Sequence, residues 1–210
     1  GHEDTLVVQN DRGVLNMTVG DSTARQAVIG LNGTTTGNDA LQVIGTGNSN
    51  ITLLVEGVEF LGARDNPVQT NAQGTAIQNI TLFNNSFVNA HPDITSGGGG
   101  IAIGLSAGTG AGPGLTYRIE GNTFRGAEGT AIFTNAIGPA GTMSGRIINN
   151  TIGTPNGTFN SAQAQTGSSS FGNGIGVFLE KGAGTGSLTG RVLIENNTIV
   201  DSARMTLAAG

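Results

Sequence analysis

The chain of 210 residues has no cysteine, no tryptophan, a single tyrosine and a single lysine, Lys181. Without cysteine, disulfide bridges and thiolate metal sites are excluded. A nucleic-acid surface needs a basic stripe with aromatic platforms, whereas the eight arginines are scattered and the net charge is −5, so we expect no nucleic-acid partner. No apolar run approaches the length that crosses a bilayer, so we also expect no membrane span.

Small and turn-forming residues are abundant instead, with 37 glycines, 26 threonines and 21 asparagines. This composition disfavours helix almost everywhere and therefore favours an all-β fold. Scarce lysine and absent cysteine, combined with abundant Gly, Asn and Thr, are typical of an exported bacterial surface or matrix protein. We therefore expect an extracellular or cell-surface location.

A corner motif recurs along the chain. Each copy has a short alternating apolar strand, then Asn-Asn or Gly-Asn, then Thr or Ser, then one Ile or Phe. The clear copies are Ile80–Ala90, Tyr117–Ala127, Arg146–Gly153 and Gly190–Ala203, and Leu53–Ala63 is a fainter one with Val58 at the Asn position. Alternation with period two indicates a strand with one buried face, and Asn and Gly tolerate the left-handed backbone of a sharp corner.

The second corner residues lie 37, 28 and 47 residues apart, which is the spacing of solenoid repeats. We expect their side chains to form a structural ladder of stacked amides. These residues are Asn85, Asn122, Asn150 and Asn197.

A second short strand, opened by glycine, precedes each clear corner. The four are Gly74–Gln78, Gly100–Gly104, Gly129–Phe133 and Gly174–Phe178. A strand, a loop, a second strand, an Asn corner and a short third strand make one coil. From Leu53 to the C-terminus the chain resembles the right-handed parallel β-helix proteins of the pectin-lyase-like family. The resemblance implies a single-domain right-handed parallel β-helix whose coils stack about 4.8 Å apart.

Inward positions follow from the alternation. The predicted core pairs are Leu53 with Val55, Ile80 with Leu82, and Tyr117 with Ile119, followed by Ile147 or Ile148. After the corners, one column should contain Phe60, Phe87, Phe124, Ile152 and Ile199. Two polar segments, Ser96–Gly114 and Gly153–Gly174, are predicted to be long loops.

The two ends of the chain differ from its middle. Residues 1–50 contain strand-like segments but no Asn corner, so they are predicted to be irregular coils or a cap, or else the start of a helix whose earlier coils are missing. Residues 51–210 are predicted to be β-helix coils that end part-way round a coil after Ala203. Either the chain was cut from a longer solenoid or another chain completes that coil.

A search for chemistry finds no catalytic set. The resemblance implies that a hydrolase of this type carries Asn-x-Asp, Asp-Asp, Gly-His-Gly and Arg-x-Lys, and none is present. Asp65, Asp93 and Asp201 occupy related places after their corners, but solvated turn residues are the preferred interpretation. His91 lies in a predicted loop and His2 in the tail. We therefore predict no catalytic residue, no metal ligand and no cofactor.

Two functions remain open. The first is a non-enzymatic extracellular structural protein, such as an adhesin, a stalk or a matrix-fibre subunit, which assembles head-to-tail into a filament by stacking its ends. Its assembly strands would contain Leu6, Val8 and Leu15 at one end, and Met205 and Leu207 at the other. The alternative is a carbohydrate-active or carbohydrate-binding module, resembling a polysaccharide lyase, with a glycan partner held by the long loops.

Overall fold

The computed structural model describes residues 4–21, 27–29, 38–61, 63–88, 100–106, 112–127, 129–153 and 173–200. Every regular element in these ranges is a β-strand. The strands are β1 (Leu6–Gly20), β2 (Ala27–Ile29), β3 (Leu41–Glu56), β4 (Val58–Leu61), β5 (Val68–Gln73), β6 (Ile77–Phe83), β7 (Ser86–Val88), β8 (Ile101–Ser106), β9 (Gly114–Glu120), β10 (Thr123–Arg125), β11 (Ile132–Gly138), β12 (Gly141–Ile148), β13 (Thr151–Ile152), β14 (Ile175–Lys181), β15 (Leu188–Glu195) and β16 (Thr198–Ile199).

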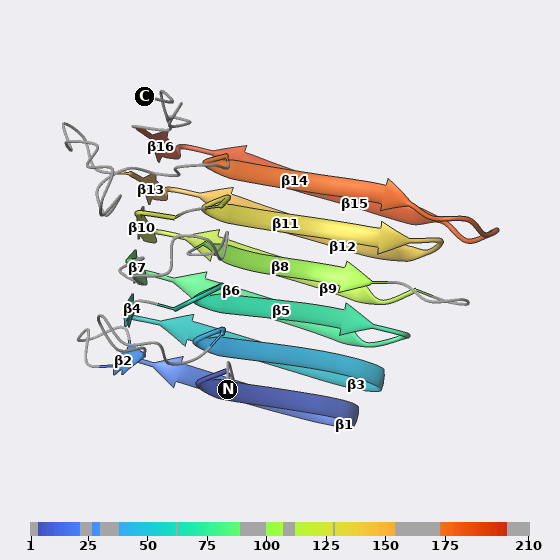
Figure 1. Ribbon diagram of the computed structural model, residues 1–210. Coiled ribbons are helices and arrows are strands. Elements are labelled where there is room, and N and C mark those ends of the chain that lie inside the picture. The colour runs from blue at the N-terminus through green and yellow to red at the C-terminus, as the bar shows by residue number, and fades with distance from the viewer. Residues whose placement is uncertain are drawn as a thin grey trace, which may run out of the picture.

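The strands are wound into a solenoid, and Figure 1 shows the coils stacked from β1 at one end to β14 and β15 at the other. Each coil places strands on three faces. The first face has the order β14-β11-β8-β5 followed by the first half of β3, and the second face has the second half of β3 followed by β6-β9-β12-β15. The third face is the six-stranded sheet β16-β13-β10-β7-β4-β2.

Every described strand pair is parallel, so equivalent residues of successive coils stand in register. For example, Leu53 pairs with Ile80, and Ile80 pairs with Tyr117. The predicted all-β, parallel solenoid is thus confirmed.

The first two coils are built differently from the later ones, because β1 and β3 each run unbroken across two faces. Both strands bend where a glycine has a positive φ, at Gly13 (82°) and Gly47 (57°), and the register between them shifts after Asn10. Strand β3 also runs through residue 50, where the sequence predicted a change from irregular to regular coils. Whether the first fifty residues act as a cap stays a prediction.

Two segments differ from their predicted roles. Gly74–Gln78 is not a separate strand, because Gly74 has a φ of 68° and forms the corner between β5 and β6. The first-face strand of this coil is β5, which sequence reasoning missed. The predicted loop Ser96–Gly114 is too long, because this range contains strand β8, whose Leu105 is fully buried.

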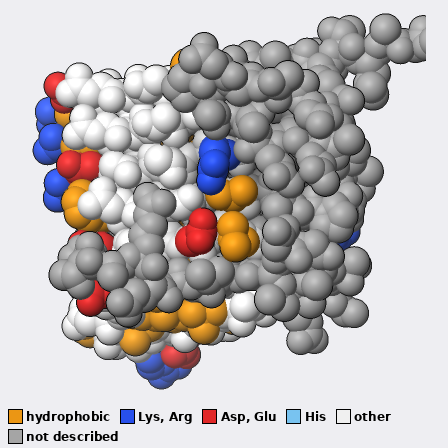
Figure 2. Space-filling model, turned by 90° about the vertical axis from the view of Figure 1, so that its left-hand side faces the viewer, with side chains coloured by type: hydrophobic (Ala, Val, Ile, Leu, Met, Phe, Trp, Pro, Cys, Tyr) orange, Lys and Arg blue, Asp and Glu red, His pale blue; other side chains and the backbone are white. Residues whose placement is uncertain are grey.

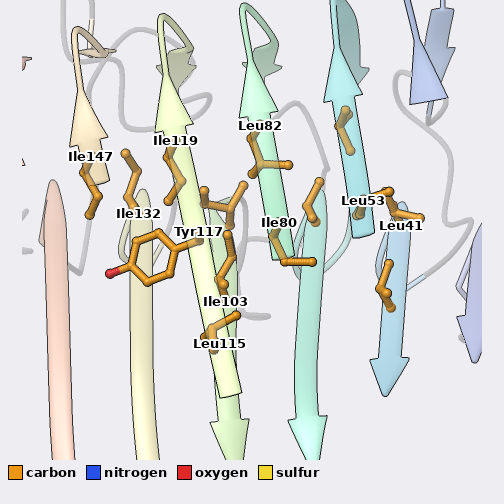
Figure 3. Close-up of a cluster of buried hydrophobic side chains, with 14 of the residues drawn as sticks. Leu41, Leu53, Ile80, Leu82, Ile103, Leu115, Tyr117, Ile119, Ile132 and Ile147 are labelled. Carbon is orange, nitrogen blue, oxygen red and sulfur yellow. The ribbon is translucent and has the colours of Figure 1, made fainter. Parts of the chain in front are cut away.

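The core is a set of apolar columns, and Figure 3 shows several of their members between the faces. All the predicted inward residues are buried, and the pairing of Ile119 with Ile147 decides between Ile147 and Ile148. The predicted post-corner column is confirmed as well. The ring centroids of Phe60 and Phe87 lie 4.9 Å apart and those of Phe87 and Phe124 lie 4.7 Å apart, nearly parallel in both cases. Ile152 and Ile199 continue it in register.

One core position is filled from the neighbouring coil. Tyr117 pairs with Gly145, and a Cβ atom at Gly145 would lie 1.9 Å from Cζ of the tyrosine ring. The ring therefore occupies the space of the missing side chain. Its hydroxyl contacts the Thr134 hydroxyl at 3.0 Å across the core, which gives a buried phenol a hydrogen-bond partner.

Candidate functional site

The asparagine corners combine two roles in consecutive residues. The first corner residue has left-handed backbone, as Asn84 (φ 54°), Asn149 (56°) and Asn196 (53°) show. Glycine takes this place in the other two corners, at Gly57 and Gly121. The second residue points its side chain into the solenoid, because the sharp turn between the second and third faces directs it inward.

The structure places Asn85, Asn122, Asn150 and Asn197 in one column, which we call the asparagine ladder. The Nδ2 group of each of the first three donates to Oδ1 of the next, over 2.9–3.0 Å. Each backbone N–H donates to the same Oδ1 atom, and each Nδ2 also donates back to a carbonyl of the preceding coil, as Asn122 does to Leu82. The ladder holds the corners together, and because the first three side chains are buried, none of these three presents a group to a ligand.

A second polar column stands where coils enter the first face, and sequence reasoning missed it. Oδ1 of Asp4 accepts the backbone N–H of Asp39 at 2.9 Å, and Oδ1 of Asp39 accepts that of Asn66 at 3.0 Å. Thr130 does the same for Asn173 further along the solenoid, at 3.3 Å. The only available signal was a polar residue two positions before five of the six first-face strands, β8 being the exception.

Asp39 is the most perturbed acid in this column. Burial raises its pKa to about 6, and the nearby Asp65 and Asp4 carboxylates act in the same direction, whereas hydrogen bonds from Asn66 and Gln42 oppose the rise. Burial likewise raises the pKa of Asp65. Among the residues that the structure describes, no three His, Cys, Asp or Glu side chains are placed to hold a metal ion. Asp93, Asp201, His2 and His91 lie outside the described residues.

The N-terminal end of the described solenoid has a partly uncovered core. Leu6, Val8 and Leu15 point inward from β1 and are only half-buried, because β1 pairs with β3 on one side alone. Figure 2 shows hydrophobic side chains gathered at the lower end of the molecule, where β1 lies. These three predicted assembly residues thus lie together on one end surface, which we call the β1 end.

The last described coil leaves its own inward positions exposed. Val177 and Leu179 on β14, Ile194 on β15 and Ile199 on β16 are 39%, 49%, 50% and 45% exposed. Their counterparts one coil earlier, such as Ile147 opposite Ile194, are fully buried. We call this surface the β14–β16 end. The other two predicted assembly residues, Met205 and Leu207, lie outside the described residues.

Comparisons with known proteins add no identification. No protein-family model, no curated protein and no solved structure matches the chain. The described residues also contain no helix long and apolar enough to cross a membrane.

Proposed function

We propose that the protein is a non-enzymatic extracellular structural protein whose copies stack end to end, the β14–β16 end of one against the β1 end of the next. The exposed inward side chains of the last described coil carry this proposal. Exposed apolar residues scattered over a surface are normal, but here they occupy inward positions that the coils between the two ends bury.

The inward columns allow such a junction. One column of the second face is aliphatic in every coil and consists of Val19, Val55, Leu82, Ile119, Ile147 and Ile194. Stacking a second copy sets its Val19 against Ile194, which continues the column across the junction. In the same register Met17 meets Val192, and Val8 meets Val177.

The backbone edges match as well. β1 pairs only with β3, while β14 pairs only with β11 and β15 only with β12, so both ends of the described solenoid have one unpaired edge. All strands run parallel, and a second copy in the same orientation can therefore extend the sheets. Contact between two different ends of identical chains is heterologous and does not close, so repeated stacking gives a filament. Adhesins, stalks and matrix fibres are the classes that use such filaments.

The other expectations are part of the same proposal. Kinship with the pectin-lyase-like β-helix proteins is supported by the Asn corners, and an extracellular or cell-surface location by the scarcity of lysine and the absence of cysteine. Without cysteine, the junction between copies is non-covalent, and assembly depends on protein concentration.

Two neighbouring residues of β15 provide the test. Ile194 points inward and is 50% exposed, whereas Leu193 points outward and is 44% exposed. We expect the unaltered protein to form larger species as its concentration rises, seen by sedimentation velocity and as filaments with a regular axial repeat by electron microscopy. Ile194→Asp should abolish them because it places a charge in the junction, and Leu193→Asp should leave them intact. A monomer at every concentration, or equal effects of the two variants, would contradict the proposal.

A further inference from the structure

The outer surface of the first face is uneven, because one strand carries only small outward residues. Along β8, Ile101, Ile103 and Leu105 point inward and are fully buried, so Ala102, Gly104 and Ser106 point outward. This row of small residues crosses the middle of the face and forms the floor of a depression.

Larger side chains stand on both sides of this floor. In register with it are Gln69, Asn71 and Gln73 on β5, and Phe133, Asn135 and Ile137 on β11. Strands lie 4.7–4.9 Å apart, so the two walls are separated by about 10 Å. The depression has a volume of about 240 Å³. We call it the β8 trough.

The polar groups of the trough are almost all amides. Gln69, Asn71, Gln73 and Asn135 each carry both a donor and an acceptor, and none of the described residues that line the trough is ionisable. Asn71 Oδ1 is buried and has no hydrogen-bond partner among the residues that the structure describes. Asn135 reaches over Gly104, where a Cβ atom would lie 2.1 Å from its Oδ1. An uncharged ligand with many hydroxyl groups suits this set.

An aromatic surface borders the same trough. Phe133 is half-buried at its wall, and the next coil adds Phe178, whose ring centroid lies 5.3 Å away and which is 53% exposed. The rings of Phe60, Phe87, Phe124 and Tyr117 are buried inside the solenoid. Phe133 and Phe178 point outward on the first face, and Phe83 points outward on the second face, away from the trough. An apolar ring face beside amides is the surface to which a pyranose ring binds, with its C–H face on the aromatic ring and its hydroxyls on the amides.

From this combination we infer that the β8 trough binds a neutral saccharide chain, with a sugar ring against Phe133 and hydroxyls on Asn135 and the other side-chain amides of the walls. An acidic glycan would find no cationic partner among the described residues of the trough. An extended peptide would pair with an open sheet edge, but β8 is paired with β5 on one side and β11 on the other. This binding is independent of end-to-end stacking and involves no bond cleavage.

The chain offers a substitution that closes the trough without touching the core. Gln42, Gln69 and Ala102 are paired in register across strands β3, β5 and β8, and all three point outward. Gln42 Nε2 donates to Gln69 Oε1 at 3.0 Å. Ala102→Gln extends the row of amides and fills the floor of the trough. Thr116→Gln places the same side chain at an exposed outward position of β9 on the second face, and serves as the control.

Binding is measured on the full chain by ¹⁵N–¹H chemical-shift changes and calorimetry, with cellohexaose, maltohexaose and mannohexaose as neutral probes and hexagalacturonate as an acidic one. We expect at least one neutral probe to bind at millimolar concentration or below and to shift resonances of β5, β8 and β11. Ala102→Gln should weaken it at least about tenfold and Asn135→Ala about fivefold, with no effect of Thr116→Gln.

Three results would overturn the inference: no shift with any neutral probe, tighter binding of the acidic hexamer, or equal effects of Ala102→Gln and Thr116→Gln. Filament formation is scored in the same samples. If no saccharide binds but filaments form, the trough inference fails and the stacking proposal stands. If a saccharide binds but no filaments form, the stacking proposal fails and the trough inference stands.

Discussion

Replacing Asn122 with alanine should destabilise the protein strongly, because its side chain makes four hydrogen bonds. Nδ2 donates to Leu82 O (2.9 Å) and Asn150 Oδ1 (3.0 Å), and Oδ1 accepts from the backbone N–H (2.9 Å) and Nδ2 (3.0 Å) of Asn85. At about 1 kcal/mol net for each bond, with a further cost for the buried N–H left unpaired, we expect a loss of about 3–5 kcal/mol in the free energy of unfolding.

Asn197 provides a matched control. Its side chain also makes four hydrogen bonds, donating to Ile147 O (2.7 Å) and Glu195 O (3.1 Å) and accepting from the N–H and Nδ2 of Asn150. These bonds are exposed or only part-buried, so water replaces much of what Asn197→Ala removes. We expect a loss of about 1–2 kcal/mol for this variant.

Urea unfolding at protein concentrations below assembly measures both variants. Far-ultraviolet circular dichroism reports the sheets, and the fluorescence of the single tyrosine, Tyr117, reports one core position. Coincidence of the two transitions establishes two-state behaviour, which is needed because a solenoid can unfold coil by coil. Equal losses for Asn122→Ala and Asn197→Ala would refute the reasoning, since burial is what distinguishes them.

Three further predictions concern other parts of the core and the second polar column. Gly145→Ala should cost about 2–4 kcal/mol in urea unfolding, because the new methyl group overlaps the Tyr117 ring; an unchanged midpoint would show that the ring moves aside freely. Phe87→Leu should lower the melting temperature, because it removes both ring contacts of a stacked residue. Asp39 takes up a proton on folding because its pKa is raised from 3.8 to about 6, so the free energy of unfolding should fall as pH rises through that window, by about 1–2 kcal/mol after screening. Asp39→Asn should reduce this dependence to the part that Asp65 contributes and stabilise the protein at neutral pH, and an unaltered pH profile would exclude Asp39 as its source.

The sequence was sufficient to predict the architecture because the corner is a local signal. The first corner residue has left-handed backbone and is therefore Asn or Gly, and the second supplies the inward amide and is therefore Asn. The Phe column follows two residues after the second corner residue. The exposed inward residues at the ends also follow from alternation once the coils are aligned.

Other features depend on pairings that a single coil does not reveal. The space for Tyr117 exists because Gly145 lies opposite it in the next coil, and no local pattern connects the two positions. Asp39 was missed because a polar residue at a turn is usually solvated, whereas here it is buried by its neighbours. The β8 trough required the outward residues of three coils to be placed side by side, which only the register provides.

The hydrogen bonds of the two polar columns run in opposite directions along the chain, and this matters while the chain is being synthesised on the ribosome. In the asparagine ladder, the amide of a later coil satisfies the backbone N–H of the coil before it, as Asn122 does for Asn85. In the other column, the side chain of the earlier coil accepts the backbone N–H of the later coil, as Asp39 Oδ1 does for Asn66. A chain that emerges from its N-terminus therefore offers several of the new coils, such as those that begin at Asp39 and Asn66, an acceptor already in place at the first face. Its last asparagine corner stays incomplete until the next coil forms. We therefore expect the coils to form in the order of translation, and a chain stalled during synthesis to end at a corner whose backbone N–H has no partner.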